Sequence, residues 1–175
     1  MQHPATQEAF VRLVNDHRGM LFKVCRLYCT AEADRQDLFQ EIVVQLWRSY
    51  PAFRGDSTTG TWLYRIALNT AITGLRKRKR AIALASTDPD RLPAGLEDIP
   101  YNMEKEEQLK LLYSAISQLT EVEKALTMLY LEDKSYQEME DILGISQNNL
   151  RVKMNRIKEK LRKSTQAFAY GIGKS

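Results

Sequence analysis

The sequence predicts an all-α protein made of two small helical domains joined by a flexible linker. Apolar residues recur at spacings of three and four along most of the chain, which is typical of amphipathic helices. No segment shows the clear alternation of apolar and polar residues that indicates a half-buried strand. An acidic, proline-containing stretch, residues 81–104, interrupts the helical pattern. It separates a predicted first domain, residues 1–80, from a predicted second domain, residues 105–170.

The first domain is expected to contain three helices. Apolar residues from Phe10 to Leu27 form the stripe of one helix, and Thr6 is placed to cap it. A second helix is predicted from about Glu32 to Tyr50, where Pro51 would end it. The Gly-, Ser- and Thr-rich segment 53–61 is predicted to be a loop, and a third helix follows over residues 62–80.

The second domain contains two capping-box signatures, Thr120 with Glu123 and Ser135 with Glu138. Gly144 is placed to end the helix that Ser135 opens, and Ser146 to cap the next one, which we expect to reach about Lys163. The tail AFAYGIGKS, residues 167–175, is predicted to be frayed. Residues 135–163 therefore have the spacing of a helix-turn-helix unit, in which Tyr136, Met139, Ile142 and Leu143 pack on Leu150, Met154, Ile157 and Leu161.

The last helix of this unit has the composition of a helix that enters the major groove of DNA. Seven Lys/Arg and one Glu lie in residues 151–163, and amides stand near the helix start. Amides pair with base edges, arginine grips guanine, and lysines hold phosphates. The predicted DNA-binding residues are Gln147, Asn148, Asn149, Arg151, Lys153, Asn155, Arg156 and Lys158. The alternative is an ordinary helical hairpin with a solvated charged face.

The charge distribution also indicates a polyanionic partner. The formal net charge is +4 for 175 residues, but it is +6 over residues 1–80, −4 over 81–104 and +2 over 105–175. Five consecutive basic residues, 76–80, stand at the end of the third predicted helix, where the helix dipole favours positive charge too weakly to explain them. Binding to a phosphate backbone explains the run, and a solvated surface is the alternative.

Other composition signals favour no catalytic or metal site. Cys25 and Cys29 are too few for a disulfide framework, and no Cys/His set has zinc spacing. We predict two buried thiols, with redox sensing as the alternative. We expect no cofactor, no metal, no signal peptide and no membrane insertion, and hence a soluble protein of the cytoplasm that associates with the nucleoid when active.

Two stretches of the first domain resemble a known family: ADRQDLFQEIVVQLW, Ala33 to Trp47, and FRGDSTTGTWLYRIALNTAI, Phe53 to Ile72. They resemble region two of bacterial sigma factors of the sigma-70 family, specifically the extracytoplasmic-function group. The helix-turn-helix unit resembles region four of the same family. Leu68 and Thr73 stand where many relatives have polar or acidic residues, so the resemblance does not predict the promoter sequence.

The resemblance implies partners and sites. One face of the second helix would bind the β′ clamp helices of core RNA polymerase: Asp37, Gln40, Glu41, Val44, Gln45 and Arg48. The promoter −10 element would be bound and melted by Phe53, Arg54, Asp56, Ser57, Thr58, Tyr64, Arg65, Asn69, Arg76, Lys77, Arg78, Lys79 and Arg80. Trp62 would line the same region or belong to the core. The helix-turn-helix residues would bind the −35 element.

Further partners implied by the resemblance are the polymerase β flap and an anti-sigma protein. The acidic linker would run along polymerase channels. Two other functions fit parts of the sequence. A stand-alone helix-turn-helix regulator would need a dimer, for which no heptads are present. A nucleic-acid-processing enzyme would need clustered carboxylates, metal ligands or a phosphate loop, and Gly55, Asp56 and Gly60 are too sparse for such a loop.

Overall fold

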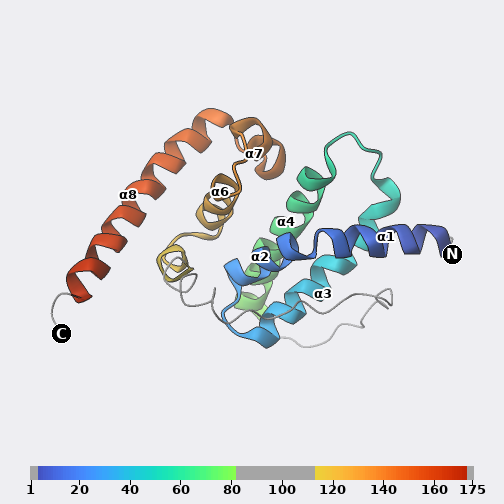
Figure 1. Ribbon diagram of the computed structural model, residues 1–175, viewed down its shortest axis with the longest axis horizontal. Coiled ribbons are helices and arrows are strands. Elements are labelled where there is room, and N and C mark those ends of the chain that lie inside the picture. The colour runs from blue at the N-terminus through green and yellow to red at the C-terminus, as the bar shows by residue number, and fades with distance from the viewer. Residues whose placement is uncertain (1–3, 82–112, 173–175) are drawn as a thin grey trace. The chain divides into compact units, whose positions relative to one another are not determined.

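The chain divides into two compact units, Met1–Pro100 and Tyr101–Ser175, and the described residues of each form helices (Figure 1). The computed structural model describes the backbone of residues 4–81 and 113–172, with side chains placed for residues 6–75 and 113–164. Within these ranges every regular element is a helix, which confirms the all-α class. Nearly all of the predicted linker, residues 81–104, lies outside the described residues.

The first unit begins with two helices, α1 (Pro4–Asp16) and α2 (Arg18–Tyr28), where we predicted one. His17 interrupts the helix, with φ −109° and ψ 11°. Its backbone N–H and its ring Nδ1 both donate to the carbonyl of Leu13, at 3.3 and 2.9 Å. The predicted cap at Thr6 is also wrong, because α1 already begins at Pro4, and proline is favoured in a first turn that needs no N–H.

Two longer helices complete this unit: α3 (Glu32–Ser49), followed by the short 3-10 helix η1 (Tyr50–Ala52), and α4 (Thr59–Ala81). The end of α3 just before Pro51 agrees with the prediction. Helix α4 begins three residues earlier than predicted, because Thr58 Oγ1 accepts the N–H of Thr61 at 3.3 Å. Helices α2, α3 and α4 pack on one another, and the core they share includes Leu21, Val24, Cys25, Ile42, Val43, Leu46, Leu63, Ala67 and Ala71.

Aromatic side chains extend this core. The Phe10 ring of α1 lies 4.8 Å from the Trp47 ring of α3. On α2, the Arg18 guanidinium lies over the rings of Phe39 and Phe22, at 4.7 and 5.7 Å from their centroids. Its Nε and Nη1 are buried with no hydrogen-bond partner among the described residues. Arg18 is thus held by ring contacts that leave two buried donors unsatisfied.

The second unit contains helical residues 113–117 and then α6 (Glu121–Leu131), α7 (Tyr136–Leu143) and α8 (Gln147–Ile172). Both predicted capping boxes are confirmed: Thr120 and Ser135 each exchange side-chain and backbone hydrogen bonds with the glutamate three residues later. Gly144 ends α7 with φ 68°, in the left-handed region. Helices α6 and α7 each pack on α8.

Helix α8 starts where predicted, directly after Ser146, but it extends to Ile172 instead of ending near Lys163. The frayed tail expected after that residue is therefore wrong for the described part of the chain. Gln166, Ala167 and Ala169 favour a helix past Lys163, and no Gly or Pro interrupts the chain before Gly171. No helix in the described ranges combines the length and apolar character that a membrane crossing requires.

Candidate nucleic-acid interface

The outer face of α8 is polar and basic. Leu150, Met154 and Ile157 are buried against α6 and α7, as predicted, whereas Leu161 and the α7 residues Tyr136 and Leu143 are half-buried. Of the predicted DNA-binding residues, only Gln147 is half-buried. The other seven are exposed: Asn148, Asn149, Arg151, Lys153, Asn155, Arg156 and Lys158. The structure therefore gathers these side chains on one accessible helix surface in the second unit.

A hydrogen-bond network links the start of α8 to α7. Gln147 Nε2 donates to Gln137 Oε1 at 2.8 Å and to Glu140 Oε2 at 3.0 Å. Arg151 donates to Asn148 Oδ1 at 3.3 Å and to Gln147 Oε1 at 3.4 Å. Gln147 is thus engaged within the protein and orients the side chain of Arg151. Nothing in the spacing of the sequence identified Gln137 or Glu140 as partners, because they are placed by the turn between the two helices.

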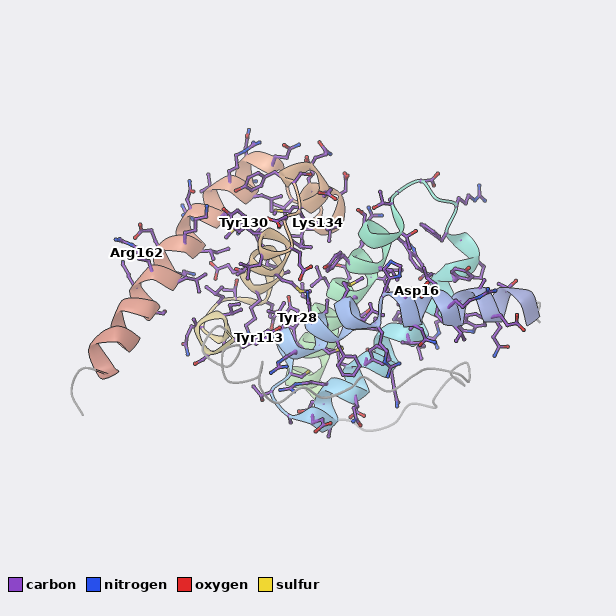
Figure 2. The ribbon with its side chains drawn as sticks, viewed as in Figure 1. Asp16, Tyr28, Tyr113, Tyr130, Lys134 and Arg162 are labelled. Atoms are coloured by element: carbon purple, nitrogen blue, oxygen red, sulfur yellow. The ribbon has the colours of Figure 1, made fainter. Side chains whose placement is uncertain are left out.

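Two tyrosines support basic residues of this face. The guanidinium of Arg151 lies 5.0 Å from the centroid of the Tyr136 ring. Lys158 Nζ lies 4.6 Å from the centroid of the Tyr130 ring, and Tyr130 is seen at the end of α6 in Figure 2. A hydrogen bond to Tyr130 raises the pKa of Lys158. Both cations are held at the helix surface by contacts that the sequence did not reveal.

A salt bridge ties the middle of α8 to the start of α6. Lys160 Nζ lies 2.7 Å from Glu123 Oε1, while Glu123 Oε2 accepts the N–H of Thr120 at 3.0 Å. Partial burial alone would raise the pKa of Glu123. The hydrogen bonds from Lys160 and Thr120 outweigh it and hold the pKa below its ordinary value. One carboxylate thus caps α6 and holds α8 against it.

In the first unit, the predicted docking face of α3 lies outside the core. Asp37, Gln40 and Arg48 are exposed, and Glu41, Val44 and Gln45 are half-buried. Glu41 lies against α4, where its carboxylate would be 3.5 Å from a methyl group placed on Gly74. The absence of a side chain at Gly74 leaves room for this carboxylate. The face is therefore accessible, but Glu41 is set back toward α4.

The loop before α4 is arranged around Trp62. The Phe53 ring stacks on the Trp62 ring, with centroids 4.6 Å apart and planes inclined by 29°. Trp62 is 8% exposed, so it belongs to the core, as the alternative assignment held. Phe53 is half-buried, whereas Arg54 and Asp56 are exposed beside Gly55, which has φ 79°. The loop thus offers polar groups next to an aromatic stack.

One residue of the predicted −10 set is buried in this structure. Tyr64 is 4% exposed and belongs to the core, because its position on α4 faces the other helices. Leu68 is likewise buried, at 1% exposure. Thr58 and Asn69 are exposed, while Ser57 and Arg65 are half-buried. The side chains of residues 76–80 lie outside the described ones, although the backbone of the basic run continues α4 to Ala81.

The described part of the chain holds no group of three or more metal-ligating side chains. Cys25 and Cys29 are free and buried, as predicted. Burial, with the neighbouring Cys29 thiol, raises the pKa of Cys25 to about 12. A thiol of such high pKa is a poor nucleophile at neutral pH.

Comparisons with known proteins agree with this organisation. Residues 13–81 match the family model of sigma-70 region 2, and residues 109–161 match that of sigma-70 region 4. The chain is 30% identical over 171 residues to the ECF RNA polymerase sigma-E factor of Escherichia coli K12, covering 91% of this chain and 88% of the relative. It is 28% identical over 169 residues to the sigma-E factor of Haemophilus influenzae, covering 91% and 89%.

Two solved structures share the fold. One is CnrH in complex with the cytosolic domain of CnrY, with a TM-score of 0.65 and 22% identity over 92% of this chain and 90% of that one. The other is the sigma factor RpoE of Bartonella quintana in complex with the anti-sigma factor NepR, with a TM-score of 0.68 and 17% identity over 91% and 98%. At these identities the likeness concerns the fold.

Proposed function

The chain belongs to the extracytoplasmic-function group of the sigma-70 family, and we propose that it directs core RNA polymerase to specific promoters and promotes the melting of their DNA. The observation that carries the proposal is the match of both sigma-70 regions, in order, to the two compact units. Sigma factors are initiation factors without a catalytic centre. We infer that this chain likewise performs no covalent chemistry and works in the cytoplasm, where polymerase and DNA lie.

Helix α8 is proposed to bind the −35 element in the major groove. Its N-terminal turns present Asn148, Asn149 and Arg151, whose amide and guanidinium groups suit adenine and guanine edges. Lys153 and Lys158 would hold the phosphates on either side. The contacts of Gln147 to α7 and of Lys160 to Glu123 support this role, because they keep the helix at a defined orientation in its unit.

The loop before α4 and the exposed side of α4 are proposed to bind the −10 element. Arg54, Asp56, Thr58 and Asn69 are accessible there, and the half-buried Phe53, which stacks on the buried Trp62, provides an aromatic group in the same loop. An unstacked base needs both a stacking surface and polar groups for its edge. The basic run 76–80 would hold the adjoining phosphates. Tyr64 is left out of this proposal because it is buried.

The accessible face of α3, residues 37–48, is proposed to dock on the β′ clamp helices of core polymerase, and the second unit on the β flap. This face of α3 carries acidic, amide and basic side chains around the half-buried Val44, a mixture that suits a polar protein interface. An anti-sigma protein is a further proposed partner, since one of the similar solved structures is a complex with such a protein.

Run-off transcription with purified core polymerase tests the function. Fragments of the native genome are transcribed with and without this chain, and we expect discrete transcripts only in its presence. Mapping their start points identifies the −10 and −35 sequences. Arg156→Gln should lower transcription from these promoters roughly tenfold, because one bidentate contact between arginine and guanine contributes about 1–3 kcal/mol. Arg162→Gln is the matched control, since Arg162 lies on the same helix and pairs with Glu159 at 3.0 Å. Absence of any chain-dependent transcript would refute the proposal.

A further inference from the structure

An exposed apolar residue stands in the middle of the polar face of α8. Val152 is 50% exposed, and it is the sixth residue of the helix. Leu150 and Met154, two positions before and after it, are buried. At about 100° per residue, Val152 points about 200° away from Leu150, directly away from the core. Val152 thus lies on the side of the helix that faces away from the core of its own unit.

The neighbours of Val152 on the helix surface are all polar. Residues three and four positions away share its face, and they are Asn148, Asn149, Asn155 and Arg156, each exposed. Arg151, next in sequence, is directed sideways toward the Tyr136 ring and Asn148. One apolar group is therefore surrounded by three amides and a guanidinium.

Local folding does not account for a valine at this position. A β-branched side chain loses rotamer freedom in a helix, so valine is less favourable there than an unbranched polar residue. The exposed position also provides no burial that would compensate. An exposed valine therefore contributes little to the stability of its own unit, and a partner that covered it would gain apolar contact.

The major groove offers one apolar group along its base edges, the C5 methyl group of thymine. Asparagine recognises the adenine of the same base pair through N6 and N7. A valine flanked by asparagines three and four residues away matches both halves of an A·T pair or of two neighbouring A·T pairs. The composition of this face thus favours thymine and adenine at the centre of the contacted sequence.

We infer that Val152 is a specificity-determining residue that contacts a thymine methyl group in the −35 element, an inference that rests on the proposed function. Val152 discriminates thymine from the other bases, while Asn148, Asn149 or Asn155 pairs with adenine beside it. The −35 element of this protein's promoters accordingly contains at least one A·T pair under the second turn of α8. Burying one methyl group corresponds to about a fourfold gain in affinity.

Deoxyuridine substitution tests the inference, because it removes the thymine methyl group and leaves the base-pairing edge intact. Holoenzyme is formed from the full chain and core polymerase, and its Kd is measured on a promoter identified by run-off mapping. Each thymine of the −35 element, on either strand, is replaced in turn by deoxyuridine. The wild-type protein should lose affinity about fourfold at one position and little at the others.

Variants of Val152 show whether this residue makes the contact. Val152→Ser removes the apolar surface and should bind thymine and deoxyuridine templates equally well. Val152→Thr keeps the branched shape and one methyl group, so it should retain part of the discrimination. Both changes lie at an exposed position, and circular dichroism checks that α8 remains folded.

Three outcomes would overturn the inference: a −35 element without any A·T pair, no deoxyuridine effect at any position, or an equal effect in wild type and Val152→Ser. None of them affects the proposed function, which the unmodified promoter and wild-type chain establish independently. Loss of all chain-dependent transcription, by contrast, would remove the proposed function and this inference together.

Discussion

Replacement of Gly144 by alanine adds one methyl group at the turn between α7 and α8. The added Cβ meets no atom within 4 Å, so no steric clash opposes the change. The cost comes from the backbone, because Gly144 has φ 68° and a left-handed conformation costs an alanine about 1–2 kcal/mol. Alanine also restricts the unfolded chain, which offsets about 0.4–1 kcal/mol of this destabilisation. We expect a net destabilisation of about 1 kcal/mol.

Gly19→Ala is the matched control. Gly19 is the second residue of α2, its added Cβ also meets nothing within 4 Å, and its backbone is helical. The same methyl group should therefore raise the free energy of unfolding there, by up to about 0.5–1 kcal/mol. Opposite signs for two chemically identical changes would isolate the backbone conformation as the cause.

Two signals separate the units during unfolding. Both tryptophans, Trp47 and Trp62, lie in the first unit, so their fluorescence reports on that unit, whereas circular dichroism at 222 nm reports on all helices. Gly144→Ala should lower the midpoint of the second unit, seen as the part of the circular-dichroism transition without a fluorescence change, by about 4–8 °C and leave the fluorescence midpoint unchanged. Gly144→Asn should cost less, since asparagine tolerates this conformation. A neutral or stabilising Gly144→Ala would refute the reasoning.

Three further predictions follow from individual contacts. The Cys25 thiol ionises near pH 9 when unfolded and near pH 12 when folded. The contribution of this thiol to stability is therefore complete below pH 9. It should be lost between pH 9 and 12, at up to about 1.4 kcal/mol per pH unit. In urea unfolding, the free energy of unfolding of Cys25→Ala should fall less steeply with pH than that of the wild type, and equal slopes would contradict the assignment. Glu123→Gln and Lys160→Met should show a coupling energy of about 0.3–1 kcal/mol in a double-mutant cycle, because the salt bridge between Glu123 and Lys160 lies at the surface. Strictly additive effects of the two substitutions would mean that the 2.7 Å contact contributes nothing in solution. Arg18→Met should raise the free energy of unfolding by about 1 kcal/mol, because it removes two buried donors without partners and keeps an apolar chain over Phe22 and Phe39. A loss of stability would show that the contacts of the guanidinium with the two rings outweigh the cost of the unsatisfied donors.

Helices and their ends were largely determined by the sequence. Thr120, Ser135 and Gly144 act within a few residues of their own position, through hydrogen bonds and a backbone conformation that depend on residue type. The apolar stripe of Leu150, Met154 and Ile157 follows from the helical period alone. These features could be predicted because the interactions that produce them are local. The basic and amide-rich face of α8 is equally a consequence of that period.

Only the tertiary structure decided which of the remaining candidates are accessible and what holds them. The helical period alone does not distinguish Tyr64 from a surface residue of α4. Neighbouring helices cover that side of α4 and bury the Tyr64 side chain. The stacking of Phe53 on Trp62 and the contacts of Tyr136 with Arg151 and of Tyr130 with Lys158 join residues separated along the chain or on different helices. Such contacts depend on how helices pack, which periodicity within one helix does not specify. The sequence by itself therefore determined which chemical groups each helix presents, and packing determined which of them are exposed to bind a partner.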